Sequence, residues 1–198
     1  MAIESQLDRI AEKFERLRAS DPRCRVGSSG EHQYELNAPI SEQELAELER
    51  SHCVELPTDY RVFITTFSNG GAGPIYGQFT VQDAFAEYLT PSKPFPYEAG
   101  RRIEYSHSHS GDDLKRLREF YKDPANQYGK IVLGEMGDGI MTNLIVTGAA
   151  RSQVWIDDRT TEWGGLYPCD TFGNKEPLCF VDWYETWLDR AIARKDVP

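Results

Sequence analysis

Residues 41–73 have the sequence SEQELAELERSHCVELPTDYRVFITTFSNGGAG, which predicts two consecutive helices and a stop. The Ser41 hydroxyl can accept the backbone N–H of Glu44, while the Glu44 carboxylate can accept the N–H of Ser41, which together form a capping box. Ile40 and Leu45 have the spacing of a hydrophobic staple, in which the residue before the cap packs on the first turn. The first helix is therefore expected to begin directly after Ser41.

A proline separates the two predicted helices. Pro57 disfavours helical geometry at Leu56 but suits the first position of a new helix, so the first helix must end by Leu56 and the second begins near Pro57. The apolar face of the second helix comprises Tyr60, Phe63, Ile64 and Phe67. Asn69, Gly70 and Gly71 favour left-handed backbone geometry and are expected to end this helix.

The rest of the chain alternates between helical and strand-like patterns. Apolar residues at helical spacing predict a helix from Ile3 to about Ala19, and short strands are expected at 32–36 and 76–81. Further helices are predicted around 84–89, 114–121 and 180–192. β-rich runs separated by glycine-containing turns lie at 131–133, 140–146, 153–156 and 166–167. This order predicts an α+β fold in which helices pack on a mostly antiparallel sheet.

The combination of an acidic helix, LPTDYRVFI at 56–64 and Asn69-Gly70-Gly71 resembles the signature of the SUKH superfamily, also called the Smi/Knr family. A looser resemblance extends over residues 39–194, through IVLG at 131–134, GDG at 137–139, QVWID at 153–157 and the closing helix. The resemblance implies a protein-binding domain without enzymatic activity. Many bacterial members look like immunity proteins that neutralise a toxin, often a nuclease, and fungal members look like scaffolds in cell-wall regulation.

The length and composition favour one globular domain. The chain has 198 residues, of which 39% are hydrophobic and 12% aromatic. We divide it into residues 1–38, an N-terminal helix and lead-in packed on the core, and residues 39–198, the SUKH-like domain. Residues 91–111 of that domain form a surface excursion rich in proline and serine.

The net charge of −10 makes direct nucleic-acid binding unfavourable, because phosphate neutralisation needs clustered Lys and Arg. An acidic surface instead favours a basic protein partner, although acidity also serves solubility alone. The sequence has no apolar run long enough to span a bilayer and no secretory signal at its amino terminus, so we expect a cytoplasmic protein without membrane contact. The oligomeric state is left open.

Metal or cofactor chemistry has little support in the sequence. The four cysteines, at 24, 53, 169 and 179, form no Cys-x-x-Cys pair, so we expect reduced and mostly buried thiols. Residues 70–73 lack the strand-loop-helix context of a phosphate-binding loop, and no nucleophile elbow is present. We expect no cofactor and no catalytic residue.

The expected partner-binding face lies on the loops of the predicted sheet. The acidic side chains Asp138, Asp157, Asp158 and Glu162 converge there if the hairpins are adjacent. The aromatic anchors expected beside them are Tyr76, Trp155, Trp163 and Tyr167, whereas Trp183 and Trp187 are expected to fill the core. Two other interpretations stay open: an acid–base pair of carboxylates, and an ordinary charged rim.

These patterns lead to one functional hypothesis with two alternatives. The leading hypothesis is an immunity protein that blocks the active site of a cognate toxin with a basic surface. The first alternative is a regulatory scaffold of the cell-wall-regulator type. The second is a metal-dependent hydrolase that uses His107 and His109.

We expect protein purified without an affinity tag to contain no stoichiometric metal, because His107 and His109 have no recognisable ligand motif around them. Elemental analysis of the purified chain measures this directly. One metal ion per chain would favour the hydrolase hypothesis instead.

Overall fold

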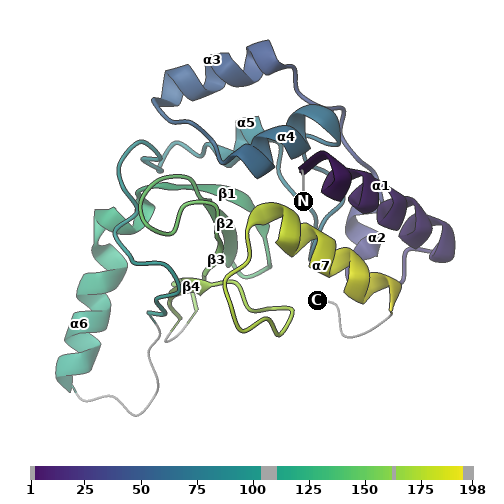
Figure 1. The fold of residues 1–198 in the computed structure, drawn as a ribbon. Coiled ribbons are helices and arrows are strands. Elements are labelled where there is room, and N and C mark those ends of the chain that lie inside the picture. The colour runs from purple at the N-terminus through teal and green to yellow at the C-terminus, as the bar shows by residue number, and fades with distance from the viewer. Residues whose placement is uncertain (1–2, 104–110, 162–163, 194–198) are drawn as a thin grey trace.

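The computed structural model describes residues 3–103, 111–161 and 164–193, and its centre is a four-stranded antiparallel sheet with strand order β1-β2-β3-β4 (Figure 1). The strands are β1 (Lys130–Glu135), β2 (Met141–Ile145), β3 (Val154–Asp157) and β4 (Leu166–Pro168). Each is antiparallel to its neighbour, and the β1–β2 register shifts between Val132 and Gly134. The predicted antiparallel meander is confirmed.

Helices precede and follow this sheet along the chain, which confirms the α+β fold class. Within the described residues they are α1 (Ile3–Ser20), α2 (Ser29–His32), α3 (Glu42–His52), α4 (Thr58–Thr66), α5 (Val81–Ala84), α6 (Gly111–Lys122), the 3-10 turn η1 (Pro124–Gln127) and α7 (Phe180–Ile192).

The two helices predicted from residues 41–73 form as α3 and α4. The capping box is present: Glu44 N donates to Ser41 Oγ over 3.2 Å, and Ser41 N donates to Glu44 Oε2 over 3.1 Å. Helix α3 ends sooner than the proline requires, because Cys53 adopts a left-handed conformation with φ of 52°. Pro57 stands just before α4 rather than at its first position.

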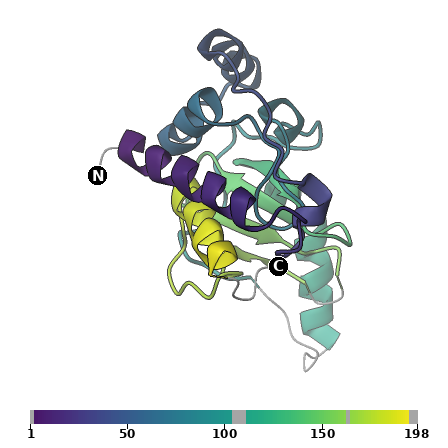
Figure 2. The ribbon, with the colours of Figure 1, turned by 90° about the vertical axis from the view of Figure 1, so that its right-hand side faces the viewer.

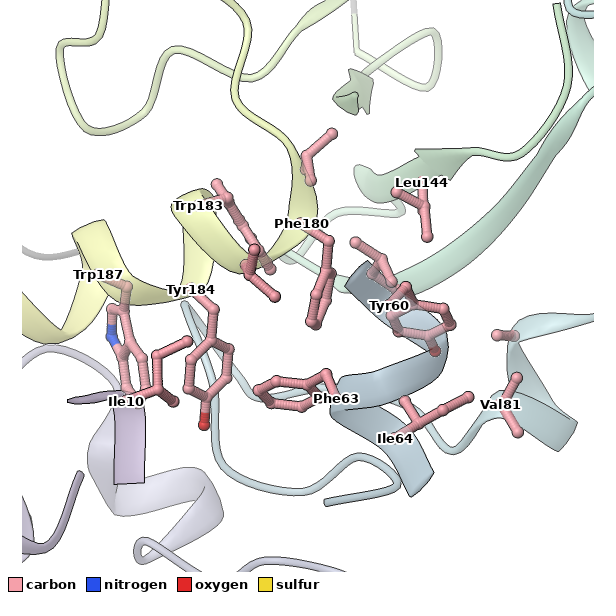
Figure 3. Packing of buried hydrophobic residues seen from close by; sticks show 14 of the residues in the cluster. Ile10, Tyr60, Phe63, Ile64, Val81, Leu144, Phe180, Trp183, Tyr184 and Trp187 are labelled. Atoms are coloured by element: carbon pink, nitrogen blue, oxygen red, sulfur yellow. The ribbon is translucent and has the colours of Figure 1, made fainter. Parts of the chain in front are cut away.

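The core forms where α4 meets α7 (Figure 3). The Phe63 ring packs edge-on against Phe180 and Tyr184, with centroids 4.9 and 4.8 Å apart. Tyr60 packs against Phe180 in the same way at 4.7 Å. Leu144 of β2 belongs to the same buried cluster, so α4, α7 and the sheet share one hydrophobic interior.

Helix α1 belongs to this interior as well. It lies beside α7 in both ribbon views (Figures 1 and 2), and it buries one face formed by Leu7, Ile10, Phe14 and Leu17. An ion cluster borders the contact between α1 and α7. Glu185 of α7 accepts hydrogen bonds from Arg9 Nε over 3.0 Å and from Lys13 Nζ over 2.9 Å. The first 20 residues therefore supply part of the core.

Two predicted strands do not form. His32 ends α2, and the left-handed conformations of Gln33 and Tyr34 turn the chain away from an extended path, so only Leu36 makes an isolated bridge, to Gly71. Residues 76–81 make only the bridge between Gln78 and Gly71 before α5 begins at Val81.

The segment after Thr90 is anchored to the sheet by an aromatic contact. Phe95 is buried and packs edge-on against Trp155 of β3, with centroids 4.9 Å apart. Together with Ile145, Ala150 and Leu166 these residues form a second, smaller core. This part of the predicted surface excursion at 91–111 is thus attached to the protein, and residues 104–110 lie outside the described ranges.

The cysteines show no disulfide. Cys169 is buried, Cys24 and Cys179 are half-buried, and Cys53 is exposed; all four are free thiols. Across the described ranges, each helix is too short or too polar to cross a bilayer.

Replacing Phe14 by Ala tests the place of α1 in the core. The loss of a fully buried ring is expected to lower the free energy of unfolding by about 3–5 kcal/mol, within a single cooperative urea transition. The matched change Glu12→Ala, on the exposed face of the same helix, should alter stability by less than about 0.5 kcal/mol. Equal stability of the two variants would show that α1 folds apart from the core.

Candidate functional site

A groove of about 350 Å³ opens where the end of α2 and the chain after it, the double-glycine turn and the segment before α5 meet the end of β1. The residues that line it are Glu31, His32, Glu35, Asn37, Gly71, Tyr76, Gly77, Gln78, Phe79 and Glu135. Four separate segments therefore contribute to one surface.

Backbone hydrogen bonds around Gly71 hold these segments together. Gly71 N donates to Gln78 O over 2.9 Å, Gln78 N donates to Gly71 O over 2.7 Å, and Ala72 N donates to Glu35 O over 2.6 Å. Phe79 N continues the pattern by donating to Leu133 O of β1 over 2.8 Å. The groove is thus attached to the sheet through main-chain contacts.

The two glycines are needed because the backbones approach too closely for a side chain. Gly70 and Gly71 have φ of 86° and 97°, and a Cβ on either would lie 2.5 Å from a carbonyl oxygen, that of Phe79 or Glu35 respectively. Asn69 completes the turn: its Oδ1 accepts Val81 N over 2.8 Å, and its Nδ2 donates to Gln82 Oε1. The motif therefore does more than end α4, because it also positions the groove and the start of α5.

The rim of the groove combines acidic and aromatic side chains. Glu31, Glu35 and Glu135 are exposed, and Tyr76 and Phe79 keep 50% and 39% of their surface in solvent. These rings are two of the three large hydrophobic side chains that are exposed within the described ranges. An exposed aromatic pair beside three carboxylates has the composition of a recognition surface for a cation.

His32 brings no positive charge into the groove at neutral pH. Burial lowers the pKa of its imidazole to about 4, because the charged form loses its hydration. Its Nδ1 accepts Tyr34 N over 3.1 Å, and its ring packs edge-on against Tyr34 and Trp187. The described lining therefore carries three negative charges and no cation.

The expected partner-binding residues are not all available to a partner. Asp157 is only 9% exposed and belongs to an internal ion cluster: Lys130 Nζ and Arg159 Nη2 each donate to its Oδ2 over 2.6 Å. These two cations hold the pKa of Asp157 below its ordinary value, against the opposing effect of burial. The geometry assigns Asp157 an internal role.

Asp158 is also engaged within its own loop, because its carboxylate accepts Gly165 N and, over 3.1 Å, the Tyr167 hydroxyl. Asp138 is exposed on the β1–β2 hairpin, and a Cβ on its neighbour Gly137 would lie 3.4 Å from the ring of Tyr76. Asp138 is thus exposed near the groove, although it is not one of the residues that line it. Glu162 and Trp163 lie outside the described residues.

The aromatic side chains considered in the sequence analysis also differ in exposure. Trp155, Trp183 and Trp187 are buried in the two cores, whereas Tyr76 is exposed on the groove. Sequence reasoning named Tyr76 as an anchor but missed Phe79, Glu31, Glu35 and Glu135. The available signal was the pair of aromatic residues around Gly77 and Gln78, which a strand assignment at 76–81 concealed.

No group of three His, Cys, Asp or Glu side chains is arranged for metal binding within residues 3–103, 111–161 and 164–193. His107 and His109 lie outside these ranges. Comparison of the chain with protein-family models, with curated proteins and with solved structures finds no match in any of the three.

Replacing Gly71 by Ala tests the backbone contact that builds the groove. The positive φ and the close approach of Glu35 O should together lower the free energy of unfolding by more than about 2 kcal/mol. Urea denaturation measures the effect. Gly111→Ala is the control, since nothing lies within 4 Å of a Cβ there and alanine suits a helix, so its stability should be unchanged or slightly higher. A Gly71→Ala variant that is as stable as the wild-type chain would refute the proposed backbone constraint.

Proposed function

We propose that the chain is a non-enzymatic protein-binding domain, an immunity protein that neutralises a cognate toxin by covering its active site with the acidic groove. The observation that carries the proposal is the surface made by Glu31, Glu35 and Glu135 around the exposed rings of Tyr76 and Phe79. The resemblance of residues 56–71 to the SUKH signature supplies the functional class.

The charge of the groove favours a basic partner. Three carboxylates on one rim, in a chain with a net charge of −10, attract a cationic surface before contact and raise the rate of association. Lys or Arg side chains in the substrate groove of a nuclease are cations of the required kind. The same charges disfavour nucleic acid as a direct ligand.

The aromatic side chains supply contact area once the partner is bound. Tyrosine and phenylalanine rings bury large apolar surfaces and attract cations over their faces, so a Lys or Arg aliphatic stem can lie against Tyr76 or Phe79. The rigid attachment of the groove to β1 limits the entropy lost when the partner binds.

This surface replaces the one expected from sequence. Asp138 stays in the proposed face because it is exposed and its neighbour Gly137 lies near the Tyr76 ring. Asp157 is left out because Lys130 and Arg159 occupy its carboxylate.

Reversing the three groove charges tests the proposal. The product of the neighbouring reading frame is expressed in a test bacterium with this chain or its variants, and survivors are counted. The wild-type chain should rescue growth and form a complex, whereas the triple variant Glu31→Lys, Glu35→Lys and Glu135→Lys should lose rescue. Its affinity should fall by about a hundredfold or more at low salt, with a smaller difference at high salt.

The control carries the same change in net charge at exposed sites on other elements, Glu12→Lys, Glu47→Lys and Glu119→Lys. It should rescue growth as the wild-type chain does. Equal loss of growth rescue in the groove variant and the control would show that net charge causes the effect, and would reject the groove as the binding surface. A toxic neighbour that the wild-type chain fails to neutralise would reject immunity, and a non-toxic neighbour bound by the groove would favour a scaffold.

A further inference from the structure

A buried charge cluster shares no residue with the groove and takes no part in the proposed function. Lys130 begins β1, Asp157 ends β3, and Arg159 follows β3 by two residues. The side chains of Lys130, Asp157 and Arg159 are only 1%, 11% and 11% exposed. Arg159 also donates through Nε to Asp157 Oδ1 over 2.7 Å, so one carboxylate receives both cations.

The cluster has an excess of positive charge. Two cations share one carboxylate, and within the described ranges no second acidic side chain interacts with Lys130. A charge that is removed from water and left without a counterion is costly, and the pKa of Lys130 is lowered by this burial. An anion beside the cluster would neutralise the excess.

A pocket of about 250 Å³ borders the same three side chains. Lys130 Nζ carries three N–H donors, of which Asp157 accepts one, and Arg159 Nη1 has no acceptor in the described part of the chain. The pocket therefore offers unused hydrogen-bond donors from both cations.

A second, independent feature of the pocket is an unsatisfied acceptor. Gln127 also lines it, and its Oε1 atom is buried without a hydrogen-bond partner among the described residues. Buried polar atoms in folded proteins are nearly always paired, so an orphaned one calls for a partner that the described residues do not supply. A hydroxyl or an amide N–H would satisfy it.

We propose that this pocket binds a small anionic molecule, whose carboxylate or phosphate group accepts hydrogen bonds from Lys130 and Arg159 and whose hydroxyl or amide donates to Gln127. The size of the pocket excludes a macromolecule and admits a compact metabolite. Tyr88, which is 56% exposed, and Tyr121 supply aromatic walls.

The pocket and the groove lie on different parts of one hairpin. Glu135, at the end of β1, lines the acidic groove, whereas Gly139 and Met141 line the cationic pocket. The two sites share no lining residue, so the anion site stands whether or not the groove binds a toxin.

The test is a titration of the full chain with sodium acetate, sodium glycolate or sodium phosphate at an ionic strength held constant with sodium chloride. NMR signals of the Arg159 Nε–H and the Gln127 side-chain amide report on the pocket, and those of Arg102 provide a surface control. Arg102 is a suitable control because it pairs with Asp170 outside the pocket.

We expect saturable shifts at Arg159 and Gln127, tighter binding of glycolate than of acetate, and no comparable shift at Arg102. The acetate and phosphate arms distinguish a carboxylate site from a phosphate site. Arg159→Gln should weaken binding by about tenfold or more, since it removes a charged donor pair, whereas Arg102→Gln should not change it.

Shifts that fail to saturate, or that are equal at Arg159 and Arg102, would overturn the proposal. These titrations of the wild-type chain test the anion site even if the Arg159→Gln variant fails to fold. Glycolate binding no tighter than acetate binding would remove the assigned role of Gln127 and overturn that part of the ligand class.

Discussion

The close backbone approach at Gly70 and Gly71 is the constraint on which both the fold and the candidate site depend. Neither position has room for a Cβ, since the carbonyl oxygens of Phe79 and Glu35 lie 2.5 Å from where those atoms would be. The contact brings the chain after α2 and the segment before α5 onto one turn. Asn69 adds the start of α5 through its bond to Val81 N.

This constraint links α4 to the groove. The aromatic packing of Phe63 on Phe180 and Tyr184 positions α4 against α7, and the turn that follows α4 is therefore placed relative to the whole core. Tyr184 also donates its hydroxyl to Ala72 O over 2.8 Å, which ties α7 directly to the same turn. The rim carboxylates and rings are thus held by the interior and not by one another.

Periodic and local signals in the sequence were sufficient for most of the architecture. The capping box at Ser41 and Glu44 depends on residues three apart, and the strands of the meander are short apolar runs between glycine turns, so neighbouring residues determine them. The strand expected at 76–81 was wrong because the positive φ of Gly77, 100°, turns the backbone out of an extended path and leaves only the bridge from Gln78 to Gly71.

The site was harder to predict because its members are distant in sequence. Glu31, Tyr76 and Glu135 meet only through the fold, and no periodicity brings them together. For Asp157 the sequence predicted a binding role that the structure does not support. Its expected position on a loop suggested an exposed carboxylate, but the side chain belongs to an internal ion cluster. Its partner Lys130 stands 27 residues away on a strand that is not its direct neighbour in the sheet, and a single sequence gives no signal for that pairing.

The opposite charges of the groove and the pocket give the protein two distinct surfaces, one suited to a cationic macromolecule and the other to a small anion. The binding role of the groove can be decided by a crystal structure of the chain with the proposed toxin partner. We expect a Lys or Arg side chain of that partner within about 4 Å of Glu35 or Glu135, lying against Tyr76 or Phe79. A toxin seated on another face, with the groove open to solvent, would contradict it.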